Sequence, residues 1–146
     1  SRPDASSEYA DYFQHRIDVA RETGMESLVE LTIKLWFTPQ SVADNIPALE
    51  KVREMILGTD QVGHAGCCEA LKKLAFGPIL YRISVPNLVL GGTQNKGASV
   101  KALAETAAKI PGAKHVVIPD AGHITALENP DAFYQAIDNF LAGQSE

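Results

Sequence analysis

The chain has 146 residues, of which 45% are hydrophobic, and its formal net charge at pH 7 is -5. This size and composition are typical of one globular domain with an apolar core, and they show no sign of disorder. The 13 Lys and Arg residues are scattered along the sequence, so neither a nucleic acid nor an anionic membrane is expected as a partner. A small neutral or modestly polar ligand fits this charge balance better.

No apolar run is long enough to cross a bilayer, and residues 1–9 lack the charged and apolar regions of a signal peptide. We therefore expect an intracellular, cytoplasmic protein. The two cysteines, Cys67 and Cys68, are neighbours, so they cannot close a stabilising loop and they match no zinc spacing. Reduced thiols in a helix are expected, with no metal site and no cofactor. A catalytic thiol would need a base, and His64 is expected on the same helical face as Cys68.

Residues 6–76 predict helices only, because apolar residues recur there at three- and four-residue spacing. The end signals are glycines, a proline and an aspartate cap. Four helices are expected: one from Tyr9 to the stop at Gly24, one over residues 25–36, one from Asn45 and Pro47 to Gly58, and one capped by Asp60 and running through Leu74.

The pattern changes after residues 76–78, a Phe-Gly-Pro turn. Residues 85–92 are apolar at almost every position, which is typical of a buried strand in a parallel sheet. Next come an amphipathic helix over residues 100–110, a second apolar strand over 115–119 and a terminal helix that starts at Asn129 and Pro130. This order predicts a right-handed parallel crossover unit. We divide the chain into a helical segment, residues 1–80, and an α/β segment, residues 81–146.

Two parallel strands do not make an independently stable sheet, and strands this apolar would leave a bare hydrogen-bonding edge and an uncovered face. Either the preceding helices cover the sheet, or further strands come from a polypeptide absent from this sequence. We favour the second arrangement.

A stretch at residues 114–130, KHVVIPDAGHITALENP, sets His123 in a tight glycine-containing loop directly after an apolar strand. A histidine held there is placed for proton transfer, although a loop histidine can also simply hydrogen-bond its own turn. Nowhere in the chain is there a G-x-S-x-G elbow, the turn that presents a nucleophilic serine. Asp120 is expected to be a turn residue rather than a partner of His123. His15 and His115 are expected to be structural or exposed.

The segments GGTQN, KIPGAKHVVIPDAGH and ENPDAFYQAIDNFL together resemble the C-terminal half of an α/β-hydrolase. More narrowly, LWFTP at residues 35–39 and GHAGCCEAL at residues 63–71 resemble the cap of the 3-oxoadipate enol-lactonase branch. The resemblance spans nearly the whole chain. It implies an α/β fold, here the helical cap and the last strand-helix-strand-helix part of a mostly parallel sheet.

In that family a serine nucleophile, an acid and a histidine follow one another along the chain. The resemblance makes His123 the catalytic base and places Asn95 at the position of the acid, after the strand that ends in two glycines. A histidine activates a serine by taking its proton, and a carboxylate holds the histidine and stabilises the imidazolium. Three readings of Asn95 stay open: a substitution that inactivates the enzyme, an acid supplied by the sixth strand or by Asp4, or a protein that has given up hydrolysis.

For the ligand, the resemblance points to the cap. Trp36 and Phe37 are expected either to line the substrate cavity or to pack in the core, and His64 and Cys67 are further substrate-binding candidates. Lactonases of this type are expected to carry an arginine just before the tryptophan. Leu35 stands there instead, which favours a less charged ester or lactone.

These patterns together predict part of a serine hydrolase that cleaves an ester or lactone. Its expected partner is the N-terminal half of the hydrolase, carrying the serine on a separate or cleaved chain, and the isolated chain is expected to be inactive. The alternative is a non-catalytic, hydrolase-derived protein that binds a small ligand.

Overall fold

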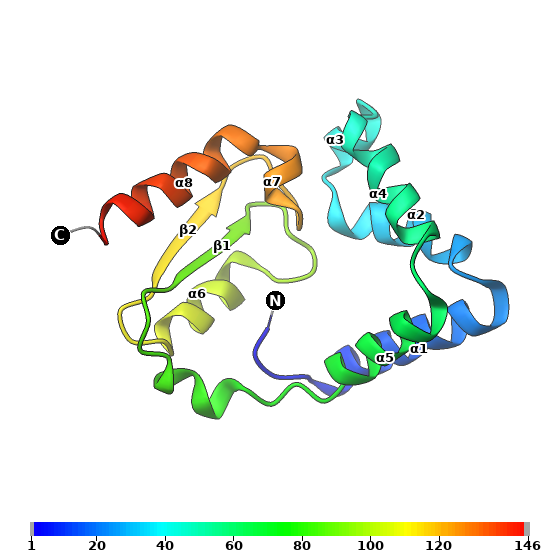
Figure 1. Ribbon diagram of the computed structural model, residues 1–146, viewed down its shortest axis with the longest axis horizontal. Helices are drawn as coiled ribbons and strands as arrows, with labels where there is room; N and C mark the ends of the chain where they lie inside the picture. Colours follow the sequence, from blue (N-terminus) through cyan, green and yellow to red (C-terminus); the bar gives the residue numbers. More distant parts are fainter. Residues whose placement is uncertain (1, 145–146) are drawn as a thin grey trace.

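A computed structural model describes residues 2–144; residue 1 and residues 145–146, which fall at the ends of the two segments, lie outside it. Figure 1 shows a group of helices on one side and a small α/β unit on the other. The helical part contains α1 (Ser7–Thr23), α2 (Glu26–Trp36), α3 (Pro39–Ala43), α4 (Pro47–Leu57), α5 (Gln61–Leu71) and the 3-10 helix η1 (Gly77–Arg82).

Helix ends in this part follow the local chemistry of the sequence. The side chain of Ser6 caps α1 by accepting a hydrogen bond from Tyr9 N–H, and α1 ends at Gly24, whose φ of 82° suits glycine. Asp60 caps α5 through Gly63 N–H at 2.7 Å, and α4 ends at Gly58. The four predicted helices are therefore present, although α5 ends at Leu71, before the predicted Leu74. The short elements α3 and η1 were not expected.

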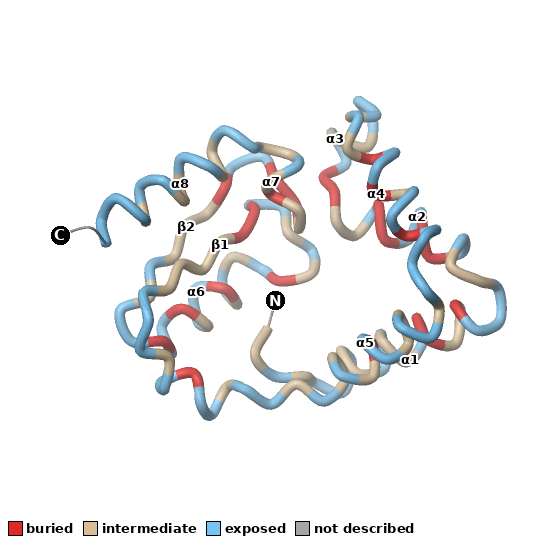
Figure 2. The backbone as a smooth tube through the Cα atoms, in the orientation of Figure 1, coloured by how far each residue is buried: buried red, intermediate tan, exposed pale blue. Residues whose placement is uncertain are grey.

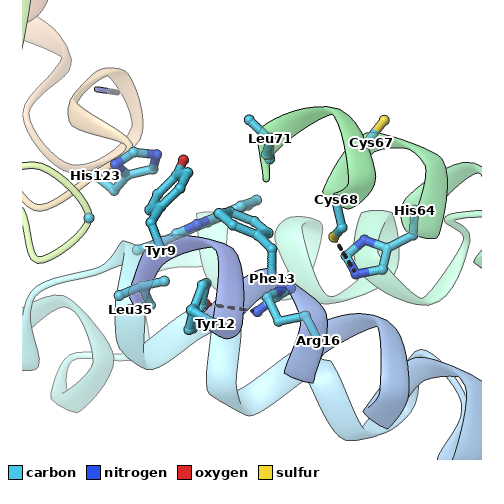
Figure 3. Close-up of a pocket in the computed structure, with 12 residues that line it drawn as sticks. Tyr9, Tyr12, Phe13, Arg16, Leu35, His64, Cys67, Cys68, Leu71 and His123 are labelled. Carbon is cyan, nitrogen blue, oxygen red and sulfur yellow. Dashed lines mark hydrogen bonds between the residues drawn. The ribbon is translucent and has the colours of Figure 1, made fainter. Parts of the chain in front are cut away.

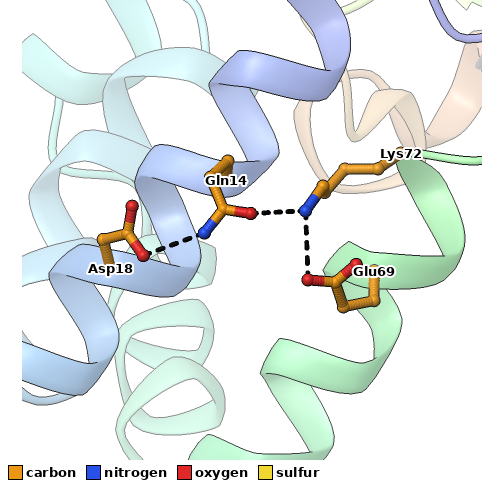
Figure 4. Close-up of polar contacts among 4 residues, drawn as sticks. All are labelled: Gln14, Asp18, Glu69 and Lys72. Carbon is orange, nitrogen blue, oxygen red and sulfur yellow. Dashed lines mark hydrogen bonds and ion pairs between the residues drawn. The ribbon is translucent and has the colours of Figure 1, made fainter.

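Two packing contacts hold the helices together. Between α2 and α4 lies a hydrophobic core that contains Ile33, Phe37, Leu49 and Val52. Along α1 and α5, polar side chains form a chain of contacts: Lys72 donates to Gln14 and pairs with Glu69, and Gln14 donates to Asp18 (Figure 4). As a result, α1 lies beside α5, and α2 beside α4.

The α/β unit contains two parallel strands, β1 (Leu88–Gly92) and β2 (Lys114–Ile118), joined by α6 (Val100–Ala108). It ends with α7 (Thr125–Glu128) and α8 (Pro130–Ala142). The predicted crossover unit is confirmed. Strand β1 begins three residues later than expected, because Val85 is exposed and Pro86 has no N–H to donate to a ladder. The single-turn helix α7 was not expected.

In residues 2–144 the sheet has only these two strands. Helices α1–α5 pack on one another and stand apart from β1 and β2 (Figure 1). Figure 2, in which each residue is coloured by its burial, shows the same separation. The buried residues of α2 and α4, in red, lie away from the strands. The first of the two arrangements considered for the sheet, a cover made by the preceding helices, is therefore wrong.

The two ends of the helical segment lie side by side. Ala5 N–H donates to Leu74 O at 2.8 Å, and Phe76 N–H donates to Pro3 O at 2.9 Å. Asp4 accepts from Gly77 N–H at 2.8 Å, and η1 then leads into the α/β unit. The helical segment thus begins and ends at one place.

Candidate active site

His123 lies in the loop between β2 and α7 and is half-buried. The loop turns at Asp120, which has a φ of 50° and is exposed. His123 N–H donates to Trp36 O at 2.7 Å, so the backbone of the loop is fixed to the end of α2. The histidine is therefore placed where the α/β unit meets the helical segment.

Asn95 lies in the turn after β1 and faces the His123 ring. Its Oδ1 accepts from Gly97 N–H at 2.9 Å and from Ala98 N–H at 3.2 Å, and it lies 3.1 Å from His123 Nδ1. The two backbone donors fix the amide with its oxygen toward the ring, so Nδ1 of His123 must carry the proton. Nε2 then keeps its lone pair, which is the state that a general base needs.

Burial, rather than the pairing with Asn95, favours the uncharged form of His123. Burial lowers the pKa of His123 below its ordinary value of 6.5. Asn95 brings no negative charge that would favour the imidazolium. Asp4, the alternative acid in the chain, instead binds Gly77, and within residues 2–144 the ring hydrogen bond of His123 goes to Asn95.

A cavity of about 320 Å³ opens beside His123 (Figure 3). Figure 3 shows His123 at one side and His64 with Cys68 at the other, with Tyr9 and Phe13 of α1 between them. Three of the predicted ligand residues, Trp36, His64 and Cys67, line the cavity together with His123. The full lining is Tyr9, Tyr12, Phe13, Arg16, Leu35, Trp36, His64, Cys67, Cys68, Leu71, Gly97 and His123.

Phe37 does not line this cavity. Its side chain is 1% exposed and packs in the core between α2 and α4. Trp36 and Phe37 are consecutive residues where α2 ends, so their side chains point in different directions and only one of them reaches the cavity. The Trp36 ring lies 6.1 Å from the His123 ring.

His64 and Cys68 share a helical face, as expected, with Sγ 3.5 Å from Nε2. Burial raises the pKa of Cys68 and lowers the pKa of His64. Both groups are therefore neutral near pH 7, and the thiol is not activated as a nucleophile. Among residues 2–144 there is no cluster of three His, Cys, Asp or Glu side chains that could hold a metal ion.

The sequence analysis missed Arg16. This side chain is 9% exposed, lines the cavity and donates to Thr32 Oγ1 at 3.0 Å and Tyr12 OH at 3.2 Å. In the part of the chain that the structure describes, no carboxylate lies within ion-pair distance of it, and it is the only Lys, Arg, Asp or Glu in the cavity lining. A signal was present, because Arg16 interrupts the apolar stripe of α1 directly before Ile17.

Glu128 was also missed as a site residue. It is the last residue of α7, and its Oε2 accepts from Gly122 N–H at 2.6 Å, next to His123. In the sequence analysis it appeared only as the first letter of the ENP pattern that precedes the terminal helix.

Comparison with known proteins agrees with this geometry. A family model described as the alpha/beta hydrolase fold matches residues 8–130. The chain therefore belongs to the α/β-hydrolase family. In residues 2–144 the structure contains no helix with the length and apolar character needed to cross a membrane.

Within this family the chain is similar to enol-lactonases. It is 32% identical over 137 residues to 3-oxoadipate enol-lactonase 2 of Acinetobacter baylyi, which covers 88% of this chain and 48% of that protein. The enol-lactonase structure from Burkholderia xenovorans LB400 superposes with a TM-score of 0.85 at 32% identity, covering 90% of this chain and 50% of that one. A thermophilic esterase from Thermogutta terrifontis gives 0.86 at 29% identity, covering 97% and 52%. The chain spans about half the length of the relatives that it matches.

Proposed function

We propose that this chain supplies the general base and the cap of a serine hydrolase that cleaves an ester or lactone. The observation that carries the proposal is the oriented pair of His123 and Asn95, in which Nδ1–H faces Oδ1 and Nε2 remains free beside a cavity. Within residues 2–144 no serine, threonine or cysteine side chain hydrogen-bonds this ring. The attacking serine would therefore come from a polypeptide segment outside this sequence.

In the proposed reaction, Nε2 of His123 takes the proton of that serine as its oxygen attacks the carbonyl carbon. The resulting imidazolium gives the proton to the leaving alkoxide, and an acyl-enzyme forms. His123 then takes a proton from water as the water oxygen attacks the acyl carbon. The imidazolium gives this proton to the departing serine oxygen, which releases the acid and restores both the serine and the neutral His123. Backbone N–H donors that stabilise the oxyanion would come from the same outside segment.

For the substrate, the cavity favours a small ester or lactone that also carries a negative group. Leu35 alone favoured a less charged substrate, but Arg16 brings a buried positive charge into the same cavity from another helix. An unpaired buried guanidinium is stabilised by an anion. Two similar proteins support this choice, since one is named a 3-oxoadipate enol-lactonase and the other is an esterase solved with malate bound.

The test uses the complete enzyme that contains this chain, either as one polypeptide or as a complex. Replacing the base, His123→Ala, is expected to abolish ester turnover while the protein stays folded and assembled. His15→Ala, at an exposed position of α1, is the matched control and should leave turnover unchanged. Turnover that survives in His123→Ala would remove this residue from the reaction.

A second function is favoured by one observation, the neutral Asn95 at the acid position. A protein of this kind would bind the ligand in the same cavity without turning it over. Binding and hydrolysis measured on the complete protein distinguish the two functions. If the complete protein has an intact serine elbow and binds the ligand without hydrolysing it, the result supports the binding protein and contradicts the enzyme.

A further inference from the structure

Glu128 links the histidine loop to the cap with a single side chain. While Oε2 accepts from Gly122 N–H, Oε1 accepts from Thr38 N–H at 2.7 Å and from Ser41 Oγ at 2.7 Å. Gly122 belongs to the loop that carries His123, whereas Thr38 and Ser41 belong to the start of α3 in the helical segment. The two oxygens of one carboxylate thus hold the two parts of the molecule.

The donors at this junction are fixed in direction. Thr38 Oγ1 donates to Ser41 Oγ at 2.9 Å, so the hydroxyl proton of Ser41 is free to be donated to Glu128. The carboxylate thereby receives two backbone N–H groups and one hydroxyl. A carboxylate can accept hydrogen bonds on both of its oxygens at once.

The backbone held by Glu128 leaves no free space next to the base. A Cβ atom added to Gly122 would lie 2.6 Å from Trp36 O and 2.9 Å from Glu128 Oε2. The next residue, His123, donates its own N–H to Trp36 O. The position of the imidazole therefore depends on how residues 122–123 are held between the end of α2 and Glu128.

We propose that Glu128 is a positioning residue, which sets the place of the His123 imidazole relative to the cap wall formed by Trp36. This inference rests on the proposed function, because the placement matters only if His123 acts as the base. Errors of about 1 Å in the position of a catalytic group can lower a rate about 100-fold. A single acceptor group that spans the cap and the loop is well placed to prevent such errors.

The test is Glu128→Gln in the complete enzyme. An amide has one acceptor oxygen, so this variant keeps the size of the side chain but cannot accept at both ends. We expect kcat to fall about tenfold or more with KM within about twofold, because the base is displaced while the ligand cavity remains. Glu54→Gln, at an exposed position of α4, is the matched control and should match the parent enzyme.

A second readout separates positioning from stability alone. Burial lowers the pKa of His123 in the intact loop. If Glu128→Gln loosens the loop, the imidazole becomes more hydrated, its pKa rises toward 6.5, and the acid limb of the kcat/KM profile moves to higher pH. A residue that served stability only would leave this limb in place.

Several outcomes would overturn the inference. A folded Glu128→Gln enzyme with the parent kcat contradicts it, and so does a rise in KM at constant kcat. If Glu128→Gln does not fold, Ser41→Ala removes the hydroxyl that donates to Glu128 and that accepts from Thr38 Oγ1. It should still lower kcat a few-fold, so an unchanged kcat there contradicts the inference. Turnover that survives in His123→Ala would overturn both proposals, whereas turnover that depends on His123 but not on Glu128 would overturn this one only.

Discussion

The chemistry of the site depends on one hydrogen bond, from His123 Nδ1–H to Asn95 Oδ1 at 3.1 Å. The amide orients the ring as well as a carboxylate would, because Gly97 and Ala98 hold its oxygen in place. What the amide does not provide is a charge to stabilise the imidazolium during proton transfer. At the scale of the residue, the site is therefore arranged for a base but lacks part of its electrostatic support.

This deficit predicts the effect of Asn95→Asp in the complete enzyme. A carboxylate at this position can accept the same two backbone hydrogen bonds, and it adds the missing charge. Since the reverse change in a serine protease lowers turnover about 10⁴-fold, we expect a clear rise in kcat. The same charge raises the pKa of His123, so the acid limb of the pH–rate profile should move to higher pH. Asn139→Asp, at an exposed position of α8, controls for added charge, and an unchanged kcat and pH profile in Asn95→Asp would contradict the assignment.

Arg16 gives a second prediction, on substrate choice. In Arg16→Met, kcat/KM for mono-4-nitrophenyl glutarate should fall about 10- to 100-fold, because a charge-assisted contact with the free carboxylate is lost. The uncharged 4-nitrophenyl valerate should be affected little. Thr32→Val removes the partner of Arg16 but keeps its charge, so it should retain the preference for the glutarate ester. Equal losses on both esters would show that Arg16 supports the fold rather than the choice of substrate.

At the scale of secondary structure, most of the fold could be predicted. Helices α1, α2, α4 and α5 have strong end signals such as Gly24, Gly58 and Asp60, and these signals act locally. The order of strands and helices after residue 80 could also be predicted, because the spacing of apolar residues differs between a buried strand and an amphipathic helix. The elements that were missed, α3, η1 and α7, are 5, 6 and 4 residues long, too short to show a period.

Part of the candidate site could be predicted from the sequence, for a similar reason. His123, Asn95, Trp36, His64 and Cys67 stand in motifs or next to strand ends, so local sequence identifies them. Arg16 and Glu128 act through contacts between distant segments: Arg16 reaches Thr32 on α2, and Glu128 reaches Thr38, 90 residues earlier in the chain. Phe37 shows the same limit, because helix geometry rather than residue type decided that it would be buried in the core.

Residues 2–144 form a helical segment whose ends meet and a small α/β unit with two strands. These two parts are joined at the candidate site, where Trp36 and Thr38 of the helical segment contact the loop of His123 and the carboxylate of Glu128. The chain spans about half of the enol-lactonase structure that it resembles. We propose on this basis that the general base and the cavity wall lie in this chain, and that the attacking serine comes from a segment outside it.

The most direct measurement is labelling of the complete protein with a fluorophosphonate, which reacts covalently with activated serines, followed by peptide mapping. We expect one labelled serine, in a segment outside residues 1–146, and we expect the label to be lost in His123→Ala. A label on a serine within residues 1–146, or labelling that persists without His123, would contradict the account.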